Sequence, residues 1–69
     1  MTKMEAVNKA KEILQRRIVG HEDDGVFYLE QPTLDSSYGL RTITWGRGKT
    51  WVKALADLKK NVKESRNEN

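Results

Sequence analysis

The sequence predicts an α+β fold in the order helix, strand, strand, helix, because two amphipathic segments enclose two β-type segments. Apolar residues recur every three or four positions near both ends of the chain, which is typical of helices that pack on a core. β-Branched and aromatic residues cluster around Phe27 and Trp45 in between. An isolated hairpin is not stable, so we expect an antiparallel β-hairpin with both helices packed on one face.

The first helix is predicted over residues 3–19. Thr2 and Glu5 have the spacing of a capping box, and Gly20 is suited to the position just past a helix end. The next residues, 21–25, are polar and acidic and predict a solvated turn.

The two strands are predicted at residues 26–31 and 41–45, on either side of a loop rich in turn formers. Pro32 is expected to end the first strand, because proline cannot donate a ladder hydrogen bond. Whether a short third strand exists near Leu34 is left open by the pattern. The two glycines around Arg47 predict a tight turn with positive φ angles before the second helix.

The second helix follows this turn, with Thr50 as its N-cap. With 69 residues the chain predicts a single domain, with a core over about residues 3–63 and a flexible polar tail over residues 64–69. The residues expected in the core occupy the apolar faces of the four elements: Val7, Ala10, Leu14, Ile18, Phe27, Leu29, Ile43, Trp45, Trp51, Leu55, Leu58 and Val62.

Charge is distributed unevenly along the chain. The formal net charge is +3, from 13 basic and 10 acidic residues. Residues 1–19 carry a net +3, residues 20–40 a net −5 and residues 41–69 a net +5. A polyanion would therefore be attracted to both terminal segments and repelled by the middle one.

No group of residues is suited to catalysis or metal binding. The chain has no cysteine and one histidine, His21, so a thiolate site is excluded and no nucleophile has a nearby base in sequence. The acidic residues after His21 lack the spacing of a calcium loop. We therefore expect no enzymatic activity, no metal and no cofactor.

Apolar segments are short throughout the chain. None approaches the ~20 residues of a membrane span, and the charged N-terminus does not resemble a signal peptide. The sequence therefore predicts a cytoplasmic protein without a membrane partner.

The densest basic cluster surrounds the predicted glycine turn. Arg41, Arg47, Lys49 and Lys53 flank the turn and the start of the second helix. Basic side chains beside a helix N-terminus favour phosphate groups. These four residues predict contacts with the phosphates of a nucleic acid.

Residues 46–56 resemble the junction between the last strand and the second helix of double-stranded RNA-binding domains. In that family a Gly-x-Gly turn leads to Ser or Thr and to alanines in the helix. The resemblance implies strands between two helices, whereas the family's phosphate-gripping lysine positions are lost in this chain. The family's lysine pair falls on Trp51 and Val52 here, and the family has three strands where the pattern identifies two. Residues 46–56 are also similar to the strand-to-helix step of small DNA-binding domains at integrase N-termini.

A protein-binding regulator, adaptor or inhibitor is the alternative function. The acidic middle segment and the second face of the hairpin support it, and its candidate contact residues are Glu22, Asp23, Asp24 and Tyr28. A self-associating homodimer is a variant of this alternative. A small chain of this type is also compatible with a phage or mobile-element origin, which no residue tests.

Overall fold

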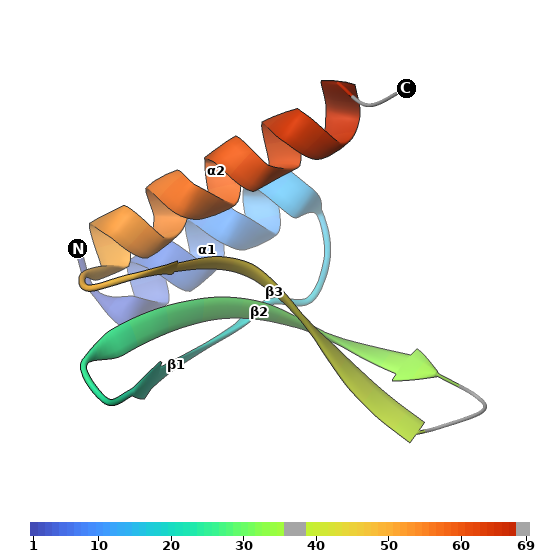
Figure 1. Cartoon of the computed structure of the whole chain (residues 1–69), viewed down its shortest axis with the longest axis horizontal. Helices are drawn as coiled ribbons and strands as arrows, with labels where there is room; N and C mark the ends of the chain where they lie inside the picture. Colours follow the sequence, from blue (N-terminus) through green and yellow to red (C-terminus); the bar gives the residue numbers. More distant parts are fainter. Residues whose placement is uncertain (36–38, 68–69) are drawn as a thin grey trace.

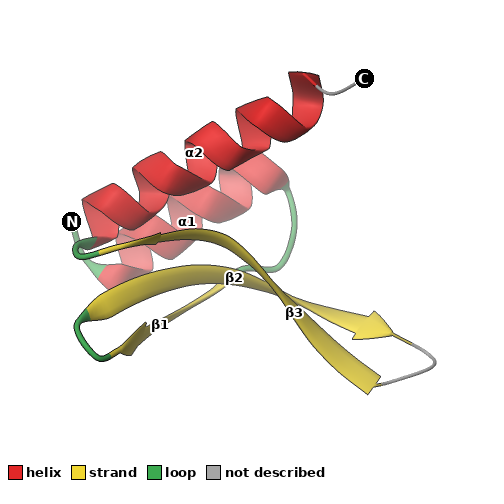
Figure 2. Ribbon diagram, in the orientation of Figure 1, coloured by secondary structure: helices red, strands yellow, loops and turns green. Residues whose placement is uncertain are grey.

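Two helices lie side by side on one face of a three-stranded antiparallel sheet in the computed structural model, which describes residues 1–35 and 39–67 (Figures 1 and 2). The elements, in chain order, are α1 (Lys3–Leu14), β1 (Val19–Asp23), β2 (Val26–Asp35), β3 (Gly39–Gly48) and α2 (Trp51–Asn67). The strand order in the sheet is β1-β2-β3. The predicted α+β class, with both helices on one face of an antiparallel hairpin, is confirmed.

The strand β1 is an addition to the predicted architecture. It occupies residues that the pattern assigned to a helix end and a polar turn, and it pairs with β2 through His21 opposite Tyr28. Asp24 and Gly25 have φ angles of 51° and 76°, as in the two-residue turns that join hairpin strands. This Asp-Gly pair was the one local signal for the strand, because β1 is exposed along most of its length and shows no apolar alternation. With β1 the sheet has three strands where the sequence pattern identified two.

Helix α1 is shorter than predicted and ends at Leu14. Gln15 adopts a left-handed conformation, with φ 53° and ψ 41°, and its N–H donates to the Lys11 carbonyl at 2.7 Å. The prediction of Gly20 as the residue past the helix end is wrong. Gly20 lies in β1, where an added Cβ would be 3.0 Å from a Val7 methyl group, so its small size admits α1 against the sheet.

The predicted capping box at the start of α1 is confirmed. The Glu5 N–H donates to Thr2 Oγ1 at 3.2 Å, and the Thr2 N–H donates to Glu5 Oε1 at 3.3 Å. The bond from the Thr2 backbone is the main cause that holds the pKa of Glu5 below its ordinary value, and the Thr2 side chain adds to it. A pKa lowered in the folded state means that this contribution to stability is complete above the ordinary glutamate pKa and is lost as the pH falls through the lower, folded-state pKa.

We expect Thr2→Ala to move the pKa of Glu5 back towards its ordinary value, because the substitution removes the side-chain hydrogen bond and frays the turn that holds the other one. An NMR titration of the Glu5 carboxyl carbon measures this change. Thr42→Ala, at an exposed site in β3, is the control and leaves the titration unchanged. The same low pKa of Glu5 in Thr2→Ala would contradict this account.

The two glycines at the end of β3 allow α2 to pack closely on the strand and do not form a turn. Neither has a positive φ angle, so the predicted glycine turn is wrong, and the chain reverses after Gly48. A Cβ added to Gly46 would lie 2.7 Å from the Leu58 nitrogen and closer still to the Ala54 carbonyl oxygen. A Cβ on Gly48 would lie 2.6 Å from Lys53 Cβ. Helix α2 therefore rests directly on the backbone of β3.

Side chains of α2 also form hydrogen bonds with backbone groups at the free edge of β3. The Asn61 side-chain amide donates to the Trp45 carbonyl at 2.6 Å, and the Arg47 N–H donates to Asp57 Oδ2 at 3.1 Å. The register shifts here, because Leu29 pairs with Gly46 and Glu30 with Thr44, which leaves Trp45 as the extra residue of a bulge. These side-chain bonds give partners to backbone groups that an edge strand leaves unpaired.

The core lies between the two helices and the adjacent half of the sheet. Its buried residues are Ala6, Ala10, Ile18, Leu29, Ala54, Leu55, Leu58 and Val62. The other predicted core residues, Val7, Leu14, Phe27, Trp45 and Trp51, are partly buried against this cluster. Ile43 is the exception, because it is 44% exposed. It pairs with Gln31 and so faces the helix side, at a point where neither helix covers the sheet.

The distal half of the β2–β3 hairpin extends past the helices as a twisted arm (Figure 1). Pro32 lies within this arm, paired with Thr42, so the prediction that it ends the strand is wrong. Strand β1 pairs with β2 only as far as Glu30, so at Pro32 one side of β2 has no partner and a missing N–H is tolerated. The loop predicted over residues 33–39 is shorter than expected, because β2 runs to Asp35 and β3 begins at Gly39, and α2 includes residues 64–67 of the predicted flexible tail. Residues 36–38 of the loop and residues 68 and 69 of the tail lie outside the described residues.

Candidate nucleic-acid interface

Three of the four predicted phosphate-binding residues surround the junction between β3 and α2. Arg47 lies in β3 opposite Tyr28, on the face of the sheet away from the helices, and is exposed. Lys49 is in the turn, and Lys53 is in the first turn of α2 with its Cβ beside Gly48. The three side chains therefore leave the chain on different sides of one strand end.

The N-terminus of α2 adds partial positive charge to this junction. The predicted N-cap is confirmed, because the Lys53 N–H donates to Thr50 Oγ1 at 3.1 Å. The first turn of α2 has no acidic residue. The positive end of the helix dipole is therefore not neutralised by a carboxylate within its first turn, which is the arrangement that favours an anion.

The basic side chains of the junction are not engaged in ion pairs. Within residues 1–35 and 39–67, no carboxylate forms an ion pair with Arg47, Lys49 or Lys53. Asp57 is the nearby acid, but it accepts the backbone N–H of Arg47 and the side-chain amide of Asn61, at 3.1 and 3.5 Å. The three cations are therefore available to an external anion.

Arg41 is separated from the other three predicted residues. It lies in the hairpin arm opposite Thr33, whose hydroxyl donates to the Arg41 carbonyl at 3.2 Å. Arg41 is six positions before Arg47 in the chain, which corresponds to roughly 20 Å along a strand. Arg41 would therefore contact a different part of a bound polyanion.

The acidic residues of the alternative site lie on different parts of the β1–β2 hairpin. Asp23 shares the open face of the sheet with Tyr28, Glu22 lies opposite Phe27 on the other face, and Asp24 is in the turn. Phe27 also pairs with Gly48, so the acidic turn is at the same end of the sheet as Lys49, two strands away. Two strand spacings are about 10 Å, so the negative charges of β1 lie within about one Debye length of β3 at 0.1 M salt.

The open face of the sheet also holds a hydrogen-bonded cluster that sequence reasoning did not identify. The His21 ring stacks on Tyr28, with centroids 4.9 Å apart, and its Nδ1 lies 2.5 Å from Glu30 Oε1. The Thr44 hydroxyl donates to the other oxygen of Glu30 at 3.2 Å. The cluster depends on β1 pairing with β2, so it could only have been found by predicting a strand at the Asp-Gly turn.

Comparisons of the chain with protein-family models, with curated proteins and with solved structures find no match. In the part of the chain that the structure describes, neither helix has the length and apolar character needed to cross a bilayer. A function for the junction of β3 and α2 therefore has to be inferred from its own geometry and charge.

Proposed function

We propose that this protein is a non-enzymatic nucleic-acid-binding protein that contacts phosphates at the junction between β3 and α2. One observation carries the proposal: Arg47, Lys49 and Lys53 lie at the junction that leads into a helix N-terminus with no acidic residue in its first turn, and among the described residues their side chains form no ion pair. Phosphate contacts of this kind supply affinity without base specificity.

The geometry supports contact with a backbone and not with a single nucleotide. The glycines of the junction are occupied by packing against α2, so they do not form a loop that could wrap a phosphate. The charge comes from flexible side chains on neighbouring surfaces of one strand end. Side chains arranged in this way contact successive phosphates along a nucleic-acid backbone. The resulting affinity falls as the salt concentration rises.

The test is fluorescence anisotropy with labelled single-stranded DNA, duplex DNA and duplex RNA at two salt concentrations. We expect the variant that combines Arg47→Gln, Lys49→Gln and Lys53→Gln to bind at least about tenfold more weakly at low salt. The slope of log affinity against log salt should fall by about 2 to 3, because each phosphate contact contributes about 0.7 to 0.9.

The matched control removes the same charge from the far half of α2, where Lys59, Lys60 and Lys63 are exposed. Their combined replacement by glutamine is expected to change the affinity by less than about threefold. Equal losses in the two triple variants would mean that net charge alone drives binding. No binding by the unmodified protein at low salt would overturn the proposal.

The hairpin arm favours a protein partner as the second candidate function. Ile43 is 44% exposed there, and β2 beyond Glu30 has a partner strand on one side only. An exposed apolar residue beside a free strand edge is a feature of surfaces that add a strand from another chain. Sedimentation at high concentration tests the homodimer: dimers that Ile43→Lys dissociates would support it, and monomers would exclude it.

A further inference from the structure

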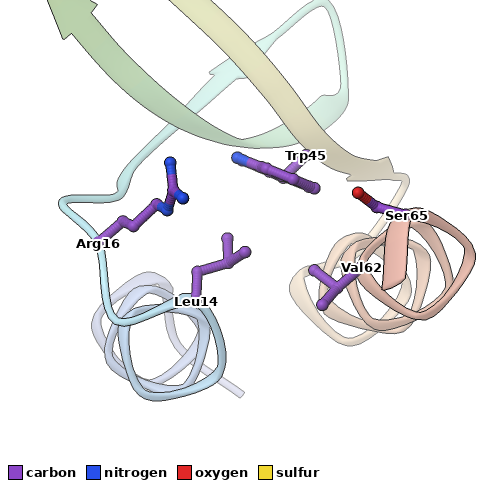
Figure 3. A pocket seen from close by; sticks show the side chains of 5 residues that line it. All are labelled: Leu14, Arg16, Trp45, Val62 and Ser65. Carbon is purple, nitrogen blue, oxygen red and sulfur yellow. The ribbon is translucent and has the colours of Figure 1, made fainter. Parts of the chain in front are cut away.

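A pocket of about 360 Å³ opens where the helices end, away from the β3–α2 junction. Its lining comes from four separate parts of the chain: Leu14, Arg16, Trp45, Val62 and Ser65. In Figure 3 the indole of Trp45 is seen nearly edge-on, between the Arg16 side chain and Ser65, with Leu14 and Val62 from the two helices beneath it. A volume of this size lies within the range of small-molecule sites, roughly 300 to 1,000 Å³.

The aromatic wall of the pocket is held in place. The indole N–H of Trp45 donates to Gln31 Oε1 at 2.8 Å, and Gln31 is only 7% exposed. The Trp45 carbonyl accepts the Asn61 amide at 2.6 Å. Because both the indole and the backbone carbonyl of Trp45 are hydrogen-bonded, the ring needs little further ordering when a ligand binds. This lowers the entropic cost of binding.

The charged residue of the pocket is Arg16, and Ser65 adds a hydroxyl group. Arg16 is exposed and, among the described residues, forms no ion pair or hydrogen bond. None of the lining residues is acidic. A planar guanidinium accepts a carboxylate in a bidentate manner, so the pocket combines a flat aromatic surface, two aliphatic side chains and one anion-binding group.

We propose that this pocket binds a small aromatic carboxylate. The ring of the ligand lies against the Trp45 indole and the side chains of Leu14 and Val62, and its carboxylate pairs with Arg16. The aromatic and aliphatic surfaces select an apolar body, and the unpaired guanidinium selects an anion over a neutral or cationic ligand. The site is separate from the proposed nucleic-acid contacts, because Lys49 and Lys53 lie at the other end of α2 and Arg47 is on the opposite face of the sheet.

The test uses the full ¹⁵N-labelled chain and 2-naphthoate as the probe. We expect the Trp45 indole N–H and the amides of Leu14, Arg16 and Val62 to shift, with a dissociation constant on the order of 1 mM or below. Arg16→Gln should weaken binding about fivefold. Arg17→Gln removes the same charge from an exposed neighbour that does not line the pocket, and it should leave the affinity unchanged.

The uncharged probe 2-naphthamide separates anion recognition from general apolar binding. We expect it to bind at least about fivefold more weakly than 2-naphthoate. Equal affinity for the two probes, or an Arg16→Gln variant that binds 2-naphthoate as well as the unmodified protein, would overturn the proposal. So would the absence of shifts at the pocket residues at millimolar probe. These outcomes are distinct from a failure of nucleic-acid binding, which is measured without the probe.

Discussion

Gly46→Ala is expected to destabilise the protein by about 3 kcal/mol or more. The new methyl group would collide with the backbone of α2 at Ala54 and Leu58, and backbone atoms cannot rotate away as the end of a side chain can. Total stability at ~0.05 to 0.15 kcal/mol per residue is roughly 3 to 10 kcal/mol for a domain of this size, so this loss is a large part of it. Urea denaturation followed by circular dichroism should therefore show a much lower unfolding midpoint for Gly46→Ala at 25 °C.

Gly25 provides the control, because this position favours glycine for a different reason. Nothing lies within 4 Å of a Cβ added at Gly25, but its φ angle is 76°. Gly25→Ala should cost only about 1 to 2 kcal/mol, and Gly25→Asn less, because asparagine tolerates this conformation. A Gly46→Ala variant as stable as Gly25→Asn would mean that α2 does not rest on β3.

Leu58→Ala is expected to cost about 2 to 5 kcal/mol. Leu58 is completely buried and lies at the centre of the face of α2 that covers Gly46. Truncation leaves a cavity that the surrounding structure can fill only in part, because the helix backbone is already in contact with the strand. The free energy of unfolding from urea titration, followed by tryptophan fluorescence, measures this loss.

Val52→Ala is the matched control on the same helix. Val52 is 56% exposed, so its truncation removes little buried surface, and alanine is the better helix former. We expect its free energy of unfolding to change by less than about 0.5 kcal/mol. If Val52→Ala and Leu58→Ala had equal effects, the buried face of α2 would be assigned incorrectly.

The local features of the fold could be predicted because they depend on near neighbours in the chain. The capping box of Thr2 and Glu5 and the Thr50 N-cap follow from side chains that bond to a backbone three residues away. The apolar faces of the helices follow from the 3.6-residue period. The basic side chains at the β3–α2 junction were likewise found from composition alone.

Strand β1, the bulge and the role of the glycines were decided by tertiary structure. β1 has almost no apolar pattern, because its stability comes from pairing with β2 and its side chains remain exposed. Ile43 has the right alternation but lies beyond the cover of the helices, and periodicity carries no information on how far a helix reaches. The sequence shows that Gly46 and Gly48 have no side chain, which is typical of a turn. It does not show that α2 occupies the space that a side chain would take.

The same division applies to the candidate sites. The positions of the charged and aromatic residues along the chain can be read from the sequence. The packing of the chain sets the rest: Arg41 lies apart from Arg47, the side chains of Arg47, Lys49 and Lys53 form no ion pair within residues 1–35 and 39–67, and a pocket forms beside Trp45. The physical reason is that each of these properties depends on the distance between residues far apart in the chain, which the packing of α1 and α2 on the sheet sets.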